Sequence, residues 1–408
     1  MTIFFSSFAP LHFFSKLMLL APVRVVRDHL TGEKYFVFNN CQFRINSFLA
    51  LLMALLELFS LRWRFQEIKN MELRHNINEL NENSSHFIPD SMSIFAVVIL
   101  SQITLAISGV IKSKTSFKLL VSFHDTLCRI DNQLERPAKG GKFKYVACVH
   151  LSLLVGLLLM DYSVWKFTLS EDGVFFSHAL SRTMCATILV QYEDAVSSLR
   201  ARFRCINFEL QRELADYFRE DCLELATKRK IKVMPARTFS RRRVGDLFQL
   251  FWLTCRGVQQ VNEVYGNLIF ALLVMTSLQL IIIPHYFLIT MFNTTEPVTE
   301  EDKICAVADS LWLGFFCVQL FVLVIPPALA SAEANRTVVI VCNYLNTNTE
   351  EYFLEELKAF VFRQSGASFE FVATNIVKLK LPLLTSVIGV TATYLLVSIQ
   401  IRKAVVDM

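Results

Sequence analysis

The residues whose types and spacing could do chemistry lie in the last apolar stretch of the chain, residues 381–401. Five side chains there recur at spacings of four, three, four and three residues, which places them on one face of a helix. We call this face the polar stripe; it consists of Ser386, Val390, Thr393, Val397 and Gln400. In a membrane helix such a stripe either packs closely on a neighbouring helix or lines water. The residues by themselves leave both interpretations open.

No catalytic or metal-binding pattern accompanies the polar stripe. The sequence holds no glycine-rich phosphate loop, no H-E-x-x-H and no G-x-S-x-G motif, and its eight histidines are scattered. No Cys-x-x-Cys pair or Cys/His cluster has the spacing of metal ligands. We interpret His150, which lies inside an apolar stretch, as a hydrogen-bonded packing residue and not as a ligand. We therefore expect no enzymatic activity, no metal and no cofactor.

The elements that position the polar stripe are membrane spans. Hydrophobic residues make up 53% of the 408 residues, including 36 Phe, and the mean hydropathy is +0.43; these values are too high for an ordinary soluble domain. Hydropathy along the chain predicts seven transmembrane helices, at residues 45–61, 92–111, 145–165, 174–192, 267–289, 306–329 and 381–401. Glu57 interrupts the first of them and Arg182 the fourth. Such charges are expected to face the bundle interior or a water-filled cavity.

The distribution of basic residues predicts the orientation of the spans. With a cytoplasmic N-terminus, 32 of the 41 Lys and Arg residues fall in cytoplasmic segments and 8 in outer segments, as the positive-inside rule requires. The C-terminus is then extracellular. The sequons at Asn83 and Asn293 fall on outer loops, where glycosylation can occur. We interpret the first twenty residues as an amphipathic segment at the inner membrane surface, and not as a signal peptide.

The cytoplasmic segments are long enough to form helices of their own. After the fourth span, apolar residues recur every three or four positions, which predicts an amphipathic helix that continues from it. These residues are Val196, Leu199, Phe203, Ile206, Leu210, Leu214 and Phe218. Their apolar face needs a partner, for which residues 244–265 and 328–362 are candidates. We interpret the basic run at residues 228–243 as a solvated linker, with contact to anionic lipid as the alternative; nucleic-acid binding has no support beyond its charge.

Aromatic and polar side chains gather at the outer ends of the third, fifth and sixth spans. Aromatic faces supply stacking area and polar groups orient a ligand, so these side chains are candidates for a small-molecule pocket. They are Asp161, Trp165, Tyr286, Asp309 and Trp312. The alternative is that Trp and Tyr collect at membrane interfaces in any membrane protein.

Four segments resemble insect gustatory receptors. The family's C-terminal signature is Thr-Tyr, five mostly hydrophobic residues and then Gln-Phe. Thr393, Tyr394 and Gln400 match this signature, and Ile401 stands in place of the Phe. Three further segments are similar to the family's N-terminal segment, its Arg-Phe-x-x-Ile/Leu-Asn stretch and its Val-Asn-x-x-Phe/Tyr-Gly stretch: residues 9–25, 199–210 and 261–270.

The resemblance implies an all-α fold, a seven-transmembrane helix bundle whose extended helices form a cytoplasmic anchor where four subunits meet. It implies that the last helix lines the pore, with Gln400 and Ile401 at the constriction and Thr393 and Val397 on the same face. It also implies a ligand site in the outer half of the bundle. The chain then divides into a cytoplasmic N-terminal segment (1–44), the first six spans with the ligand-binding outer half and the cytoplasmic extensions (45–329), anchor helices (330–380), the pore-lining span (381–401) and an extracellular tail (402–408).

The function implied by the resemblance is that of a ligand-gated channel with little discrimination among cations, in the plasma membrane of a sensory dendrite. Leu395 stands where sugar receptors typically carry Glu, so we expect a bitter or plant-derived tastant, with a fructose-type sugar receptor or an odorant receptor as alternatives. Expected partners are the tastant, membrane lipid and further subunits in a homotetramer or heteromer, and no nucleic acid. The rivals from other classes are a secondary transporter, for which no internal repeat is evident, and a G-protein-coupled receptor, which has the opposite topology.

Overall fold

Most of the chain from residue 113 onwards is described by a computed structural model. It describes residues 23–27, 34–38, 113–134, 143–168, 172–227, 234–291, 300–345, 351–365 and 369–406, together with isolated helical residues between 44 and 62. The predicted span 92–111, most of the span 45–61, the first twenty residues and the two sequons lie outside the described residues.

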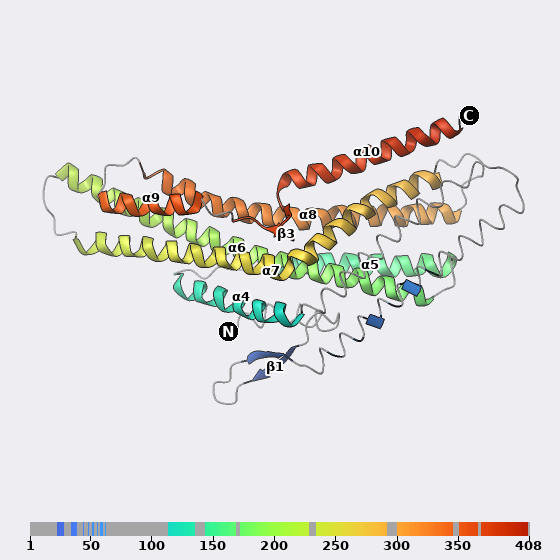
Figure 1. Cartoon of the computed structure of the whole chain (residues 1–408), viewed down its shortest axis with the longest axis horizontal. Helices are drawn as coiled ribbons and strands as arrows, with labels where there is room; N and C mark the ends of the chain where they lie inside the picture. Colours follow the sequence, from blue (N-terminus) through green and yellow to red (C-terminus); the bar gives the residue numbers. More distant parts are fainter. Residues whose placement is uncertain are drawn as a thin grey trace, which may run out of the picture.

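Seven helices make up most of the described chain (Figure 1). They are α4 (Ser113–Gln133), α5 (Phe143–Thr168), α6 (Asp172–Thr227), α7 (Met234–Met291), α8 (Glu300–Cys342), α9 (Glu351–Ser365) and α10 (Leu381–Val406). Helices α6, α7 and α8 lie side by side along the long axis and pack on one another, while α4, α5, α9 and α10 cover parts of them. The predicted helical bundle is therefore confirmed for the described residues.

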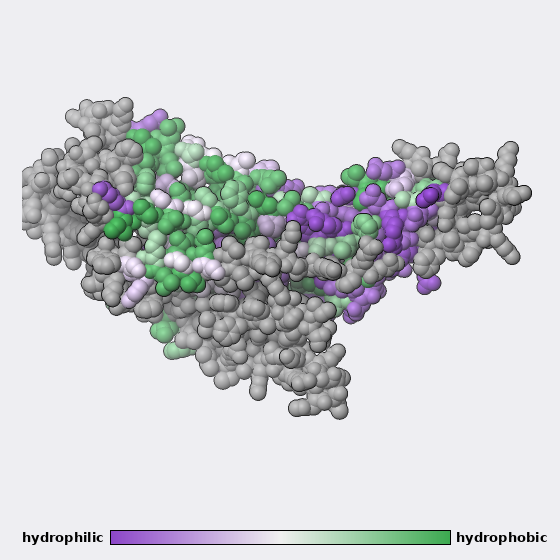
Figure 2. All heavy atoms as spheres, turned by 180° about the vertical axis from the view of Figure 1, so that it is seen from behind, coloured by the Kyte–Doolittle hydropathy of each residue, from purple (hydrophilic) through white to green (hydrophobic). Residues whose placement is uncertain are grey.

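The three central helices are too long to lie within a membrane alone. Helix α6 has 56 residues and α7 has 58, which at 1.5 Å per residue is about 84 Å or more, against a hydrocarbon core of about 30 Å. Their surface changes character along this length: hydrophobic residues dominate one half of the molecule and hydrophilic residues the other (Figure 2). Among the described residues, three stretches are long and apolar enough to cross a membrane, Arg241–His285, Ala306–Cys342 and Leu381–Gln400. A shorter apolar stretch, Ser152–Ser163, lies in α5.

The amphipathic helix predicted after the fourth span is the second half of α6. All seven of its predicted apolar residues are buried, and Leu199, Phe203 and Ile206 have no exposed surface. Helices α7 and α8 pack against α6 along this length, and Asn207 of α6 bonds to α8. The two predicted partner segments are thus confirmed as helices of one core.

Helix α4 was not expected from the sequence. It has a clear amphipathic pattern, because Phe123, Leu127, Ile130 and Leu134 recur at spacings of four and three and are buried. A search for membrane spans passes over it, since polar residues occupy its other faces.

Aromatic rings fill the core where α9 packs on the hydrophilic half of the bundle. The rings of Phe248 and Phe360 are stacked with centroids 4.0 Å apart, and Phe251 lies edge-on to Phe360 at 5.4 Å. The ring of Phe353 lies 4.5 Å from that of Tyr217. Such pairs contribute beyond the area that they bury, so α9 is held to α6 and α7 mainly by aromatic contacts.

Two short antiparallel strand pairs accompany the helices. Strands β1 (Val23–Arg27) and β2 (Lys34–Phe38) pair near the start of the chain, and β3 (Val372–Ala373) and β4 (Val377–Lys378) form a hairpin before α10. The turn of the second hairpin has positive φ at Thr374 (54°) and Asn375 (58°), as a type I′ turn requires. This hairpin lies midway along the molecule, where the helices change from hydrophilic to hydrophobic surroundings (Figures 1 and 2).

Candidate functional site

The polar stripe lies on α10, and its two hydroxyl groups form hydrogen bonds within that helix. The Ser386 hydroxyl donates a hydrogen bond to the carbonyl oxygen of Pro382 at 2.9 Å, and that of Thr393 donates to Gly389 at 2.9 Å. Bonds of this kind lower the cost of placing a hydroxyl in an apolar environment. The stripe therefore remains compatible with a membrane-spanning helix.

Helix α10 contacts the rest of the chain with one face. This contact face holds Leu383, Leu384, Val387, Thr391, Leu395 and Ser398, all partly buried. At 3.6 residues per turn the polar stripe lies on a different side of the helix, about 130° around its axis from the contact face, and all five of its residues are exposed, Val390 to 62% and Val397 to 46%. Packing against the described helices of the same chain therefore does not explain the stripe. What meets the stripe lies outside the described helices of this chain.

The residues predicted at the constriction are placed in part. Thr393, Val397 and Gln400 are exposed on one face of α10, as the spacing predicted. Ile401 continues the helix, but its side chain lies outside the described residues. Their role in a pore stays a prediction.

A polar contact joins α10 to α7 near the C-terminal end of both helices. The Ser398 hydroxyl oxygen lies 2.9 Å from Nδ1 of His285, and the ring of Tyr394 lies 6.0 Å from the His285 ring. His285 follows Pro284, whose missing N–H interrupts the hydrogen-bond ladder of α7. The tyrosine of the C-terminal signature thus lies beside a locally weakened part of α7.

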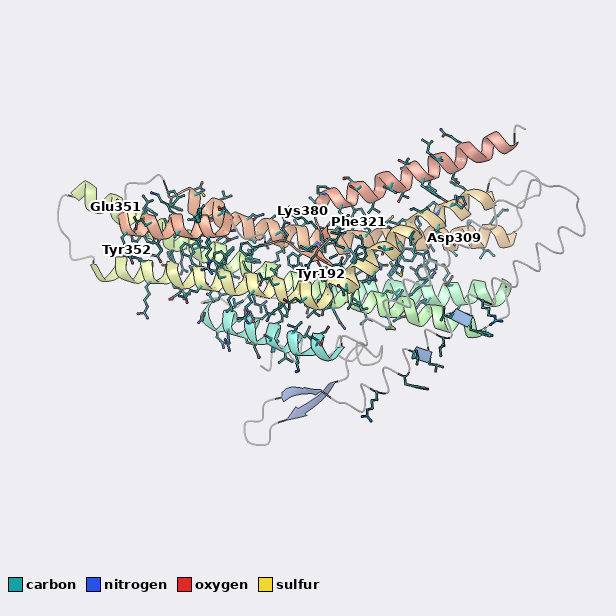
Figure 3. All side chains as sticks on the ribbon, viewed as in Figure 1. Tyr192, Asp309, Phe321, Glu351, Tyr352 and Lys380 are labelled. Carbon is teal, nitrogen blue, oxygen red and sulfur yellow. The ribbon has the colours of Figure 1, made fainter. Side chains whose placement is uncertain are left out.

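A cavity of about 280 Å³ separates α10 from α7 and α8 along the contact face. Its walls are apolar and include Pro284, Leu320, Phe321, Ile388 and Leu395; Phe321 is marked in Figure 3. Close packing normally leaves few voids larger than a water molecule. This hollow is open to the surface, and α10 packs less closely on α7 and α8 along it than a buried helix would.

Three of the five predicted pocket residues lie around Arg182. Its guanidinium, on α6, lies 3.4 Å from the carboxylate of Asp161 on α5 and 3.7 Å from the centre of the Trp312 ring on α8. Asp309 lies one turn before Trp312, close enough to interact electrostatically with Arg182 and Asp161; Figure 3 shows it in the half of the bundle that carries α10. We call these four residues the arginine cluster. Its centre is Arg182, which the sequence placed inside the bundle but not in the pocket.

The remaining predicted site residues are placed less completely. Trp165 lies on α5 and Tyr286 on α7, but their side chains fall outside the described residues, as do Asn83 and Asn293 altogether. His150 is buried and stacks on Phe315 at 5.1 Å. The packing part of its prediction is confirmed, although its Nε2 has no hydrogen-bond partner among the described residues.

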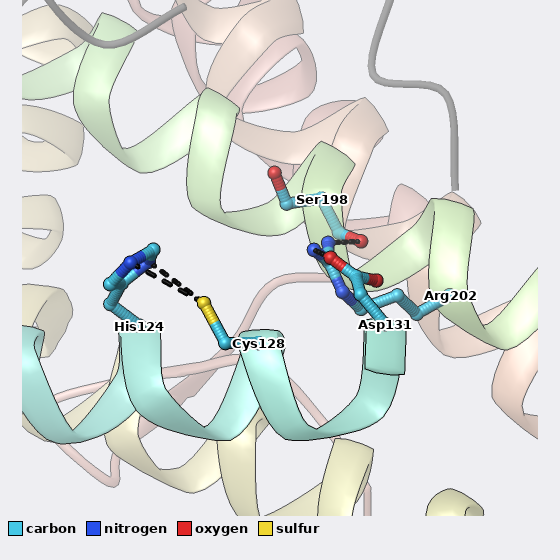
Figure 4. A network of polar contacts seen from close by, with 5 residues as sticks. All are labelled: His124, Cys128, Asp131, Ser198 and Arg202. Atoms are coloured by element: carbon cyan, nitrogen blue, oxygen red, sulfur yellow. Dashed lines mark hydrogen bonds and ion pairs between the residues drawn. The ribbon is translucent and has the colours of Figure 1, made fainter. Parts of the chain in front are cut away.

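Helices α4 and α6 are joined by a polar network away from the arginine cluster (Figure 4). The Arg202 guanidinium donates to the Asp131 carboxylate at 2.6 Å and to the Ser198 carbonyl oxygen at 2.8 Å. On α4 the Cys128 sulfur lies 3.4 Å from Nε2 of His124. Burial raises the pKa of the Cys128 thiol and lowers the pKa of His124. Both side chains therefore favour their neutral forms, which is unlike a reactive Cys–His pair.

The Arg-Phe-x-x-Ile-Asn stretch has a structural explanation. Arg202 binds Asp131 of α4, as described, and the buried ring of Phe203 packs 5.6 Å from that of Phe251 on α7. The Asn207 amide donates to the Glu333 carbonyl oxygen at 2.8 Å and accepts from the Thr337 hydroxyl at 2.6 Å, both on α8. The stretch thus ties α6 to three neighbouring helices, which its spacing alone did not reveal.

Comparisons with known proteins agree with this architecture. The fold is similar to that of the insect olfactory receptor OR5 from Machilis hrabei, with a TM-score of 0.62, 12% identity and coverage of 97% of this chain and 98% of that chain. The same receptor in complex with eugenol gives a TM-score of 0.56 at the same identity and coverage. In sequence, 119 residues are 27% identical to the gustatory receptor for sugar taste 43a of Drosophila melanogaster, a match that covers 29% of this chain and 28% of that receptor.

The family model described as 7tm chemosensory receptor matches residues 91–405. This match covers well over half of the chain and includes every helix from α4 to α10 up to residue 405. The chain therefore belongs to the 7tm chemosensory receptor family, multi-pass membrane proteins with seven spans that act as receptors and not as enzymes.

Proposed function

We propose that this chain is a gustatory receptor subunit that forms a ligand-gated, non-selective cation channel in the plasma membrane. Its N-terminus is cytoplasmic and its C-terminus extracellular, and four subunits, identical or related, place α10 around a central pore. Residues 402–408 then form a short outer tail, and the hydrophilic half of the bundle with α9 forms the cytoplasmic anchor.

The observation that carries this proposal is the exposure of the polar stripe. A helix of membrane-spanning length packs on its own bundle with a mainly apolar contact face and leaves its polar stripe exposed; apolar residues exposed beside the stripe, such as Leu396, can meet lipid or a neighbouring subunit. Four such stripes around an axis form a wet pathway, in which Gln400 supplies polar contact and Val397 with Ile401 supplies a hydrophobic constriction that can close by dewetting. The stripe carries no acidic residue, so little selection among cations is expected.

We place the proposed ligand site at the arginine cluster. Arg182 and Asp161 offer charge-assisted hydrogen bonds, and the Trp312 ring, which the Arg182 guanidinium covers in this structure, is the aromatic surface beside them. The Trp312 indole N–H is buried and has no hydrogen-bond partner among the described residues, so it is available as a donor. A small plant-derived compound with an aromatic ring and an oxygen acceptor fits these groups, and the eugenol complex of the structurally similar olfactory receptor supports this class.

A sugar is the second candidate ligand. The local similarity to a Drosophila sugar-taste receptor favours it, and a carboxylate beside an aromatic ring also suits a hydroxyl-rich ligand. Leu395, which replaces the glutamate typical of sugar receptors, argues for the plant compound.

The direct test is whole-cell current from cells that express this chain alone, with G-protein signalling blocked. Plant phenols, bitter alkaloids and sugars are applied in turn. We expect a rapid ligand-evoked current that reverses near zero, first from the plant compounds. Surface labelling controls for expression. A confirmed surface protein that takes up radiolabelled ligand without passing current would favour a transporter and overturn the proposal.

The arginine cluster is tested by Arg182→Lys, which keeps the charge but loses the flat guanidinium that stacks on Trp312. Because a cation–π contact contributes about 0.5–2 kcal/mol, we expect the half-maximal ligand concentration to rise by about twofold to thirtyfold. Arg200→Lys, on the same helix in the hydrophilic half, is the matched control. An unchanged concentration–response curve would remove Arg182 from the ligand site.

The proposed topology is tested with an antibody tag at Met408. The tag should be stained in unpermeabilised cells, and staining that needs permeabilisation would refute the extracellular C-terminus.

A further inference from the structure

Asn262 of α7 forms two hydrogen bonds with the backbone of the segment that contains the β3–β4 hairpin, which precedes α10. Its amide N–H donates to the carbonyl oxygen of Glu370 at 2.9 Å, and its amide oxygen accepts the backbone N–H of Val372 at 3.2 Å. One carboxamide therefore pairs with the hairpin backbone as a neighbouring strand would. These two bonds join residues 108 and 110 positions apart in the chain.

Gly266 lies one turn further along the same face of α7 and lets the hairpin approach. A Cβ atom at this position would lie 3.3 Å from the backbone nitrogen of Thr374 and 3.4 Å from the carbonyl oxygen of Val372. Both are backbone atoms, which cannot rotate away as a flexible side chain can. Glycine therefore favours the close approach, since an added Cβ would displace the hairpin backbone slightly, and the Val-Asn-x-x-Tyr-Gly stretch combines a backbone clamp with space for the hairpin.

The hairpin is also rigid in itself. The side chains of Phe371, Ala373 and Leu379 are almost fully buried, and the Leu379 N–H donates to the Phe371 carbonyl oxygen at 2.9 Å. Glu370 forms ion pairs with Lys378, at 2.7 Å, and with Lys380. Lys380 is the residue before α10 begins, and it lies midway along the molecule (Figure 3). A rigid hairpin therefore connects Asn262 to the first turn of α10.

Beyond this base, the hold of the bundle on α10 is looser. The most apolar part of α10 has no buried residues, and the apolar cavity of about 280 Å³ separates it from α7 and α8. Near its far end α10 has the contact between Ser398 and His285 of α7, at 2.9 Å, and between the two ends it is loosely packed. A helix that is held firmly at its base moves most easily by tilting about that base, and such a tilt changes the contact at the far end.

We propose that Asn262 is a positioning residue for the channel: by clamping the β3–β4 hairpin to α7, it makes the base of α10 a fixed pivot for gating. When the bundle moves around a bound ligand, the base of α10 stays fixed on α7. The movement therefore changes the tilt of α10 and, through the tilt, the width of the constriction. The gating part of this inference rests on the proposed channel function, whereas the clamp itself does not.

The clamp is tested without any current by hydrogen exchange of the purified full-length chain in lipid nanodiscs. Loss of two hydrogen bonds through Asn262→Ala is expected to speed amide exchange in residues 371–379 by about tenfold. Asn207→Ala, which also removes two bonds from a helix-bridging asparagine, is the matched control and should leave this segment unchanged. Equal exchange in Asn262→Ala and the unsubstituted chain would overturn the clamp.

The pivot is tested by ligand-evoked current per surface receptor. We expect Asn262→Ala to lower the maximal current by about fivefold or more while the half-maximal ligand concentration changes less than about twofold, because the ligand site is untouched. Gly266→Ala should act in the same direction through the crowded backbone. Asn262→Asp, which keeps the acceptor for Val372, should fall between the alanine variant and the unsubstituted chain.

The outcomes separate the pivot from the proposed function. If the unsubstituted chain passes no current, the channel proposal fails, and with it the pivot, while the exchange experiment still decides the clamp. If Asn262→Ala loosens the hairpin but leaves the maximal current equal to that of Asn207→Ala, the pivot is wrong and the clamp is structural.

Discussion

Helices α7 and α10 are both apolar and long enough to cross a membrane, yet they are buried to opposite extents. Of the most apolar window of α7, 56% of the residues are buried within the chain; of that of α10, none are. An apolar composition therefore predicts a membrane but does not say which neighbour a helix has. Helix α7 is largely covered by its own chain, whereas α10 leaves most of its surface exposed.

Polar contacts explain part of this difference. Helix α7 is tied to α6 by Arg243, whose guanidinium lies 3.0 Å from the Glu209 carboxylate, and to α4 by the Gln260 amide, which donates to the Ser122 hydroxyl at 2.9 Å. Helix α10 satisfies its hydroxyls internally and is joined near its C-terminal end through Ser398. A helix built to move needs few such ties, and a helix built to hold its neighbours needs many.

The largest effect that separates the two helices is expected from Phe251→Ala on α7. The Phe251 ring has no exposed surface and lies within 5.7 Å of the rings of Phe203, Phe360 and Phe369. Its truncation leaves a cavity and is expected to lower the free energy of unfolding by about 3–5 kcal/mol. Thermal unfolding in detergent measures this change.

The matched control on α10 is Val390→Ala, a truncation at a 62% exposed position. It should change the free energy of unfolding of the detergent-solubilised subunit by no more than about 0.5 kcal/mol. If both variants were equally destabilised, α10 would be packed more tightly than its exposure indicates, and the proposed difference between α7 and α10 would be wrong.

A smaller effect is expected where α4 is tied to the bundle. Arg202 and Asp131 form a contact of 2.6 Å with side chains 10% and 31% exposed, so solvent screens the pair in part. A double-mutant cycle of Arg202→Ala and Asp131→Ala should give a coupling free energy of about 1–2 kcal/mol. A coupling near zero would mean that apolar packing alone attaches α4.

Much of the core formed by α6, α7 and α8 could be predicted from the periodicity of apolar residues, because the same spacing indicates both a helix and the face that it buries. The spacing from Val196 to Phe218 predicted the buried face of α6 correctly, and the apolar stretches predicted the positions of α5, α7, α8 and α10. Helix α4 was not predicted, because hydropathy identifies wholly apolar segments and not amphipathic ones.

The candidate site was less accessible to prediction because its contacts join residues far apart in the chain. Arg182 was recognised as a charge that must face inward, but its partners Asp161 and Trp312 lie on two other helices, and no local pattern pairs them. Asn262 and Gly266 belonged to a recognised stretch, yet their role appears only when a hairpin more than 100 residues later is placed beside them. Packing between distant segments carries this information, and local spacing does not.

Gln400→Ala is expected to change stability least. It is also the most direct test of whether α10 differs from α7 by lining a pore. Gln400 is exposed on the polar stripe, so its loss should shift the free energy of unfolding by no more than about 0.5 kcal/mol and leave surface expression intact. If the stripe lines the pore, the same change removes polar groups from the conduction path of every subunit and should alter single-channel conductance or open probability. Ile399→Ala, at a 48% exposed position on another face of α10, is the control for a general effect on the helix. An unaltered current in Gln400→Ala, or an equal change in both variants, would place Gln400 outside the pore. The stripe would then be a contact with another copy of the chain, and α10 would differ from α7 only in which subunit buries it.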